Sequence, residues 1–175
     1  NQVRELCTNY GKLDILWFDF SYDDMRGEKW RATELVQMVR MLQSNVIIDN
    51  RLEVSGEGYG SLAECKPTPY HGDFVSPEQM IPPHGIQDAN GDDLYWEACV
   101  TMNNHWGFCE RDKFFKPSAM LIKKLVECVS KGGNMLLNVG PDARGNIPEE
   151  SLTRLAEMGK WMSRNRESIY SCGKS

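Results

Sequence analysis

The sequence predicts an α/β fold in which the chain forms the C-terminal half of a (β/α)8, or TIM-like, barrel. Short apolar runs of strand length alternate along its 175 residues with segments of helical periodicity, and this alternation is typical of a parallel sheet covered by helices. The pattern gives four strands and three to four helices, which is half of what the barrel contains. Each predicted strand also ends in polar residues, where the strands of α/β barrels carry catalytic groups.

The first strand is predicted in the run from residue 13 to residue 20, which is apolar at its start and reaches a carboxylate at Asp19. Trp17 and Phe18 come directly before this aspartate, and a polar loop that contains Tyr22 follows it. An aspartate at the end of a buried strand can be a catalytic group. It can also cap the next helix or pair with an arginine. This run alone leaves both interpretations open.

The other elements follow from periodicity and stop signals. An opening helix ends at Gly11 and shows no N-cap or initiator methionine, so we expect the sequence to be a piece of a longer protein. The later elements are a helix over 28–43, a strand over 46–49, a long loop over 52–93, a strand over 94–102, a helix over 117–129, a strand over 134–140 and a helix over 149–165. The inward faces of the three later helices are predicted to be Leu35, Val39 and Leu42 with Met38 alongside; Ile122, Leu125, Val126 and Val129; and Leu152, Leu155, Met158 and Trp161.

Composition and missing motifs argue against several other classes of protein. The net charge of −5 argues against nucleic acid as a partner, because phosphate binding needs a basic face. No apolar run approaches the roughly 20 residues of a membrane span. An open doubly wound sheet would show a glycine-rich phosphate turn after its first strand, and none follows Asp19. The six cysteines form no C-x-x-C pair, so a zinc site is not expected, and Cys7 and Cys128 fall in helical patterns typical of buried thiols.

Carboxylates gather at the predicted strand ends and in the long loop, which is too long to be a plain connection and is therefore expected to belong to a site. Two carboxylates beside aromatic rings are the minimal equipment of a glycosidase. The aromatic candidates are Trp17, Tyr22, Trp96 and Trp106, and core packing explains each tryptophan singly at least as well. The polar candidates are Asp19, Asp49, Arg51, Asp73, Glu78 and Glu97.

Two other chemistries have weaker support. A Ser/His/Asp hydrolase of the α/β type would carry a G-x-S-x-G elbow, and the sequence has none. His71 and Asp73 would supply two metal ligands, but no third histidine stands at a suitable spacing.

Taken together, the motifs resemble the family-29 glycoside hydrolases, the α-L-fucosidases, over almost the whole chain. The order and spacing of the matching pieces are specific, and the strongest piece is the run from Lys131 to Pro141. The other matching pieces are Tyr10-Gly11 with the run from Asp14 to Asp19; Asn50-Arg51; Gly72-Asp73-Phe74; Ser76-Pro77-Glu78-Gln79; Trp96-Glu97; Thr101-Met102-Asn103; Trp106-Gly107-Phe108; Gly145 with Ile147-Pro148; and Gly159-Lys160-Trp161 with Asn165 and Glu167-Ser168-Ile169-Tyr170.

The resemblance implies a retaining exo-α-L-fucosidase that hydrolyses terminal α-L-fucosyl linkages through a covalent fucosyl-aspartate, with no cofactor. Asp19 matches the nucleophile of the family. Glu78 matches the acid/base of many members, but the position of this group varies within the family. Glu97 is therefore the runner-up and Asp73 the third candidate.

The substrate implied by the resemblance is a fucosylated oligosaccharide or glycoconjugate. Arg51 matches an arginine that contacts the sugar, and Trp17 and Trp106 match aromatic residues that line the fucose pocket. The physical chemistry fits these roles, since a guanidinium favours the ionised form that a nucleophilic carboxylate needs. An apolar pocket favours the protonated form that an acid catalyst needs.

Two residues depart from the family pattern. Many members have a small residue after the nucleophile, where this chain has Phe20. We expect this change to reshape the aglycone side, so the resemblance implies the reaction but not the linkage preference. Arg166 stands where glycine is common in the family and bears on stability only.

The chain is also shorter than the family's enzymes. We expect residues 1–171 to be the C-terminal portion of the catalytic barrel and residues 172–175 to begin the linker to a missing C-terminal β-domain. The missing N-terminal half-barrel would be a partner, and the chain alone is expected to be inactive or very weak and prone to aggregation. The family resemblance favours an extracytoplasmic location (secreted, periplasmic or lysosomal). A non-catalytic carbohydrate-binding relative and another retaining glycosidase on the same barrel are the alternatives.

Overall fold

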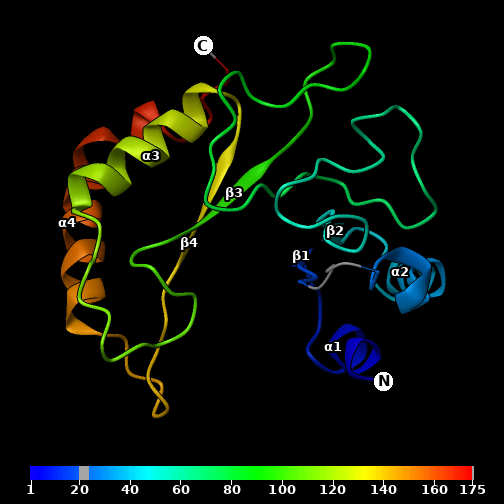
Figure 1. Ribbon diagram of the computed structural model, residues 1–175, viewed down its shortest axis with the longest axis horizontal. Coiled ribbons are helices and arrows are strands. Elements are labelled where there is room, and N and C mark those ends of the chain that lie inside the picture. The colour runs from blue at the N-terminus through cyan, green and yellow to red at the C-terminus, as the bar shows by residue number, and fades with distance from the viewer. Residues whose placement is uncertain (20–23, 175) are drawn as a thin grey trace. The chain divides into compact units, whose positions relative to one another are not determined.

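The computed structural model describes residues 1–19 and 24–174 (Figure 1). The chain forms two compact units, of which the first consists of Asn1–Pro77 and Ile86–Trp96 and the second of Glu78–Gly85 and Glu97–Ser175. Phe20 and Tyr22, which the sequence analysis singled out, lie outside the described residues. No helix in the described part of the chain is long and apolar enough to span a membrane.

The first unit is built around a short parallel strand pair. Strand β1 (Ile15–Leu16) pairs with β2 (Ile47–Ile48) in the register Ile15 to Ile47 and Leu16 to Ile48. Both strands are shorter than predicted, and Ile15 and Ile47 are about half exposed rather than buried. Because the strands run in the same direction, the residues that follow them leave from the same edge.

The helices of the first unit are α1 (Gln2–Asn9), the 3-10 helix η1 (Gly27–Trp30) and α2 (Ala32–Leu42). The single helix predicted over 28–43 is therefore wrong. Arg31 separates η1 from α2, because its φ of 53° is left-handed and cannot continue a right-handed helix.

The core of the first unit lies between these helices and the strand pair. Leu42, which was predicted to face inward, is 37% exposed, and the buried face of α2 runs through Ala32, Val36 and Val39. These three residues follow the spacing of one helical face. The buried core residues are Cys7, Ala32, Val36, Val39, Val46, Ile48 and Leu52, with Leu35 and Met38 packed against them.

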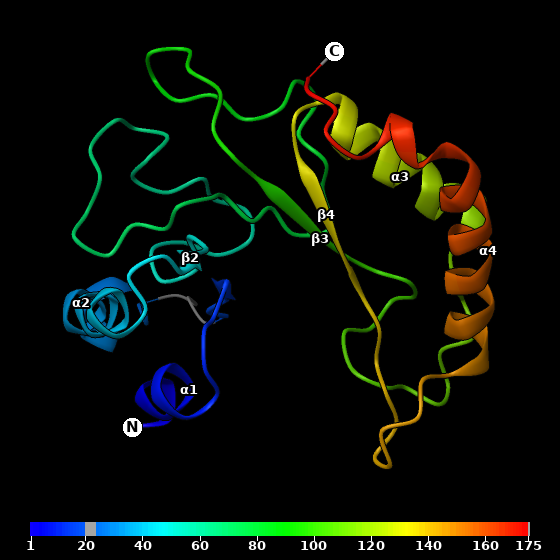
Figure 2. The same ribbon diagram turned by 180° about the vertical axis from the view of Figure 1, so that it is seen from behind.

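The second unit contains a longer parallel pair, β3 (Glu97–Thr101) and β4 (Asn134–Asn138), paired from Glu97 to Asn134 through Thr101 to Asn138. Its helices are α3 (Ser118–Ser130), α4 (Glu149–Asn165) and the 3-10 helix η2 (Arg166–Ser168). Figure 2 shows α3 and α4 side by side on one side of the strand pair. The strands and helices match the predicted alternation of β and α elements.

The buried face of α3 is turned by about one residue from the predicted one. Leu121 and Cys128 are the buried residues of α3, while Val126 is 41% exposed. In α4 the buried residues are Ser151 and Met158, so the prediction is confirmed at Met158. It is wrong at Leu152 and Leu155, which are exposed.

The long loop over 52–93 contains pairing that the sequence analysis missed. Parallel bridges join Phe74 to Asp49 and Val75 to Trp96 in the first unit, and a parallel bridge joins Glu78 to Cys99 in the second. The apolar run here is only two residues long before Ser76 and Pro77 interrupt it, so it lacks the length of a strand signal.

Gly72 stands where this extended segment meets the end of β2, and its substitution tests the packing. A Cβ at Gly72 would overlap the backbone carbonyl of Asp49 and come within 2.6 Å of the Asn50 nitrogen, whereas a Cβ at Gly159 on α4 meets nothing within 4 Å. We expect Gly72→Ala to destabilise the protein by about 1–3 kcal/mol and Gly159→Ala to stabilise it by about 0.5–1 kcal/mol. Urea denaturation of the whole protein measures both. Equal stability of Gly72→Ala and wild type would contradict this packing.

Candidate active site

Asp19 and Arg51 meet beyond the ends of the first strand pair. Asp19 follows β1, and Arg51 follows β2. Arg51 Nη1 lies 3.6 Å from Asp19 Oδ1, with the Arg51 side chain 5% exposed and that of Asp19 65% exposed. The structure therefore brings a buried cation within 3.6 Å of an accessible carboxylate.

Arg51 is held by groups other than Asp19. Its Nε donates a hydrogen bond to the Ser76 carbonyl oxygen over 3.1 Å. The centre of its guanidinium lies 4.9 Å from the ring centroid of Trp17, which is a cation–π distance. Trp17 thus lies beside the Asp19–Arg51 pair.

Asp49 is the buried acid next to this pair and is 1% exposed. Its Oδ1 accepts a hydrogen bond from the Phe18 backbone N–H over 2.8 Å. Burial raises the pKa of Asp49 to about 7, although the Phe18 N–H, the Arg51 charge and the Arg51 backbone N–H all oppose the rise. Among the described residues, neither Asp49 Oδ2 nor Trp17 Nε1 has a hydrogen-bond partner.

Asn50 and Asp73 fix the backbone around the site. Asn50 Oδ1 accepts from Ser76 N, and its Nδ2 donates to the carbonyl oxygens of Gly58 and Tyr59. Asp73 accepts from Arg40 Nη2 with both carboxylate oxygens and from Ile48 N over 2.8 Å.

The structure offers no support for a metal site at His71 and Asp73. The His71 ring nitrogen Nδ1 contacts the Gly72 carbonyl oxygen at 2.8 Å, and Asp73 is occupied by Arg40. Across residues 1–19 and 24–174, no group of three or more His, Cys, Asp or Glu side chains is placed to hold a metal ion.

The two glutamate candidates both belong to the second unit. Glu78 forms a bridge with Cys99, in the middle of β3, and its side chain is partly exposed. Glu97 is the first residue of β3, and burial raises its pKa. Thr101 ends the strand, so Glu97 lies about 13 Å from its carboxyl end at about 3.3 Å per residue.

Gln79, the residue after Glu78, forms hydrogen bonds with the last residues of β3. Its N–H donates to the Cys99 carbonyl oxygen over 2.8 Å. Its side-chain Nε2 donates to Thr101 Oγ1 over 3.0 Å, and its Oε1 accepts from Thr101 N over 3.2 Å. No role was expected for Gln79 from the sequence, and its position directly after a candidate glutamate is the signal that could have indicated one.

The loop that carries Trp106 is anchored to the end of β4. Asn138 Nδ2 donates to the Trp106 carbonyl oxygen over 2.8 Å. Gly140 approaches the same loop so closely that a Cβ there would lie 2.8 Å from the Gly107 carbonyl carbon and 2.9 Å from Phe108 N. Trp106 itself is 41% exposed, so its ring is available to a ligand.

Asp112 holds the same loop from within. It accepts from His105 Nδ1 over 2.8 Å, from Asn104 N over 2.9 Å and from Phe114 N over 3.0 Å. These hydrogen bonds, that of His105 first, lower the pKa of Asp112 to about 2. Asp112 therefore stays ionised at neutral pH. Its hydrogen bonds connect the two ends of the loop, at Asn104 and Phe114.

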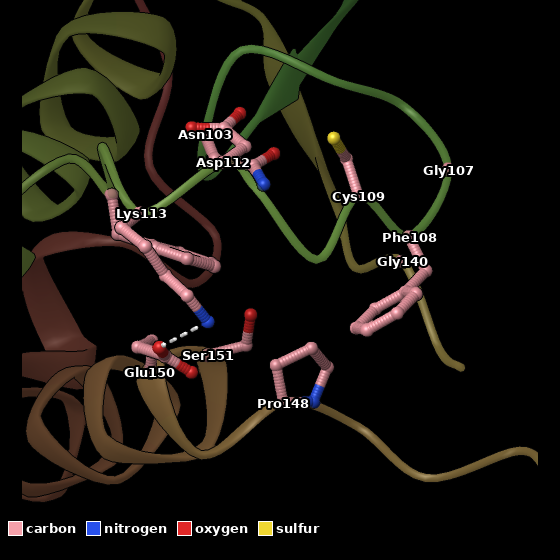
Figure 3. Close-up of a pocket in the computed structure, with 11 residues that line it drawn as sticks. Asn103, Gly107, Phe108, Cys109, Asp112, Lys113, Gly140, Pro148, Glu150 and Ser151 are labelled. Carbon is pink, nitrogen blue, oxygen red and sulfur yellow. Dashed lines mark hydrogen bonds and ion pairs between the residues drawn. The ribbon is translucent and has the colours of Figure 1, made fainter.

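A small pocket of about 20 Å³ is lined in part by Gly107, Phe108 and Cys109, which follow Trp106 in the chain (Figure 3). Both acids in its lining have partners. Asp112 accepts a hydrogen bond from His105 Nδ1, and Glu150 forms an ion pair with Lys113 Nζ at 3.4 Å. Because both acids are paired, we do not assign acid/base catalysis to this pocket. Its lining comprises Asn103, Gly107, Phe108, Cys109, Asp112, Lys113, Phe115, Gly140, Pro148, Glu150 and Ser151.

Trp96 belongs to the core and not to a site. It is 1% exposed and forms the parallel bridge with Val75 in the first unit. Core packing, the alternative that the sequence left open, is thus correct for this tryptophan. Cys7 and Cys128 are buried free thiols, as predicted.

Known proteins match this chain along nearly its whole length. Residues 1–167 match the family described as alpha-L-fucosidase. The alpha-L-fucosidase of Dictyostelium discoideum is 31% identical over 174 residues, which is 97% of this chain and 34% of that protein. The human tissue alpha-L-fucosidase is 28% identical over 176 residues. The chain spans about a third of the length of these curated relatives.

Solved structures agree with this match. Alpha-L-fucosidase isoenzyme 1 from Paenibacillus thiaminolyticus is 57% identical, with a TM-score of 0.93 over 99% of this chain and 40% of its own. A GH29 alpha-L-fucosidase from Bacteroides thetaiotaomicron is 29% identical, with a TM-score of 0.81 over 99% of this chain and 40% of its own. That structure is a trapped covalent intermediate in complex with 2-fluoro-fucosyl fluoride, obtained with a glutamate-to-glutamine mutant. The chain belongs to the α-L-fucosidase family.

Proposed function

We propose that the whole protein is a retaining exo-α-L-fucosidase that hydrolyses terminal α-L-fucosyl linkages of oligosaccharides or glycoconjugates. The observation that carries this proposal is the accessible Asp19 carboxylate beside the buried Arg51, at the end of a parallel strand in a chain of this family. The covalent intermediate trapped in the Bacteroides relative supports a fucosyl-enzyme step.

In the first step, an Asp19 carboxylate oxygen forms a bond to the anomeric carbon while the glycosidic bond breaks. Glu78 gives its proton to the leaving oxygen. In the second step, Glu78 takes a proton from water, and that water replaces Asp19 on the anomeric carbon. Retention requires carboxyl groups about 5–5.5 Å apart.

Three features bear on the acid/base assignment: one argues against Glu97 and two argue against Asp73. Glu97 lies at the amino end of β3, whereas barrel enzymes place their catalytic groups at the carboxyl ends of strands. The Asp73 carboxylate already accepts hydrogen bonds from Arg40 Nη2 and from Ile48 N. The glutamate-to-glutamine mutant used to trap the Bacteroides intermediate supports a glutamate in the acid/base role.

Arg51, Trp17 and Trp106 are proposed to bind the sugar. The Arg51 guanidinium is held rigidly, and Trp17 lies next to it. Trp106 is held by Asn138 on a loop with its ring half exposed. Aromatic faces suit the apolar face and methyl group of a fucose ring.

We further propose that the chain is the C-terminal half of the catalytic barrel and that an N-terminal half completes it. The half-exposed Ile15 and Ile47 support this, because the strands of a closed barrel are covered on both faces. The 40% coverage of the Paenibacillus enzyme supports it as well. An extracytoplasmic location is also proposed, in line with a relative named plasma alpha-L-fucosidase in human.

Replacing the nucleophile tests the proposed function directly. We expect Asp19→Asn to lower kcat on an aryl α-L-fucoside by about 10⁴-fold or more, because a neutral amide cannot form the fucosyl-enzyme. Steady-state kinetics of the whole protein, with an aryl α-galactoside as the control substrate, measures this. A wild-type protein without turnover would favour the non-catalytic carbohydrate-binding alternative, and a preference for the galactoside would favour another glycosidase.

The two glutamates give opposite expectations. Glu78→Gln should lower kcat by about 10²–10⁴-fold for an alkyl fucoside. The loss should be smaller for a dinitrophenyl fucoside, whose leaving group needs no proton. Glu97→Gln should show no such dependence on the leaving group. If Glu97→Gln and not Glu78→Gln shows it, the assignment must be reversed.

Gly140 is expected to matter through the Trp106 loop. Gly140→Ala should push the backbone of Gly107 and Phe108 away and lower kcat/KM about tenfold or more, since small displacements of positioning groups have large effects on rate. Gly159→Ala, which has open space around its Cβ, is the matched control. An unchanged kcat/KM in Gly140→Ala would argue against a role for this loop in substrate binding.

A further inference from the structure

Asp49 connects the two strand ends that carry the site. Its carboxyl group accepts the backbone N–H of Phe18, the residue directly before Asp19, and also hydrogen-bonds the backbone N–H of Arg51. One buried side chain thus contacts the backbone beside the proposed nucleophile and the backbone of its cationic partner.

We propose that Asp49 is a positioning residue for Asp19. Its Oδ1 holds the Phe18 peptide in place and so sets the direction in which the Asp19 side chain leaves the end of β1. This inference rests on the proposed function, because a fixed direction serves Asp19 only as a nucleophile that attacks one carbon atom.

The position of the hydrogen bond explains why such a residue is needed. The paired part of β1 ends at Leu16, three residues before Asp19. The ladder with β2 therefore does not extend to the nucleophile. The Phe18–Asp49 hydrogen bond continues the connection between the two strand ends at a side chain that is itself 1% exposed.

The electrostatics of Asp49 suits this role. Burial raises its pKa to about 7, so near neutral pH a large part of the population carries a neutral carboxylic acid. A neutral acid still accepts the Phe18 N–H through Oδ1 but competes less with Asp19 for the Arg51 charge. The absence of a partner for Oδ2 among the described residues is also less costly for a neutral acid than for an anion.

A matched pair of variants of the whole protein tests this inference. Asp49→Asn keeps the shape and the acceptor oxygen, whereas Asp49→Leu keeps the branched shape, with a larger volume, and has no acceptor. We expect Asp49→Leu to lower kcat on an aryl α-L-fucoside about 10- to 100-fold with KM changed less than about threefold. Asp49→Asn should keep kcat within about threefold of wild type at neutral pH.

Hydrogen exchange of the Phe18 amide gives a readout that does not need turnover. The amide should exchange at the wild-type rate in Asp49→Asn and at least tenfold faster in Asp49→Leu. If wild type does not hydrolyse fucosides, the proposed function fails, and exchange still decides whether Asp49 holds the Phe18 peptide. Unchanged kcat or unchanged exchange in Asp49→Leu would overturn the inference, as would an equal loss of kcat in both variants.

Discussion

The parallel pairing of β1 with β2 is the constraint on which the rest of the site depends. Two strands that run in the same direction end at the same edge, so the residues that follow them must meet there. This brings Asp19 from one strand end to Arg51 from the other, although 31 residues separate them in the sequence. The helix α2 between the strands covers one face of the pair and supplies the core that keeps it in place.

Burying the Arg51 guanidinium would be costly without compensation. The structure provides this compensation through the Ser76 carbonyl oxygen, the Trp17 ring and the Asp19 carboxylate. The same arrangement leaves Asp19 exposed to a ligand. A buried, fixed cation next to an accessible anion is an electrostatically preorganised arrangement, which the proposed reaction would use.

The elements with strong periodicity could be predicted from the sequence. Helices α3 and α4, strands β3 and β4, and the polar residues at strand ends stand close to their expected positions. The break between η1 and α2 at Arg31 could not be predicted. Arginine has no local preference for the left-handed conformation, so its positive φ depends on tertiary packing. The extended segment around Phe74 and Val75 was missed for a similar reason, since two apolar residues before Ser-Pro have no periodicity to read.

For the site, residue types and their place after strands put Asp19, Arg51 and Trp17 among a longer list of candidates, and the family resemblance singled them out; the structure brings these three together. Hydrogen bonds across the fold were beyond such reasoning. The Asn138 contact to the Trp106 loop and the Gln79 contacts to Thr101 depend on register between strands, which no local pattern reveals. The burial that sets Trp96 apart from Trp17 depends on the same tertiary packing.

The central claim is that the side-chain oxygen at the end of β1 bonds covalently to a fucosyl carbon. Incubating the whole protein with a 2-fluoro-fucosyl fluoride and mapping the modified peptide by mass spectrometry tests it most directly. We expect one fluorofucosyl group, attached to Asp19. A label on any other residue, or hydrolysis of fucosides with no label at all, would contradict it.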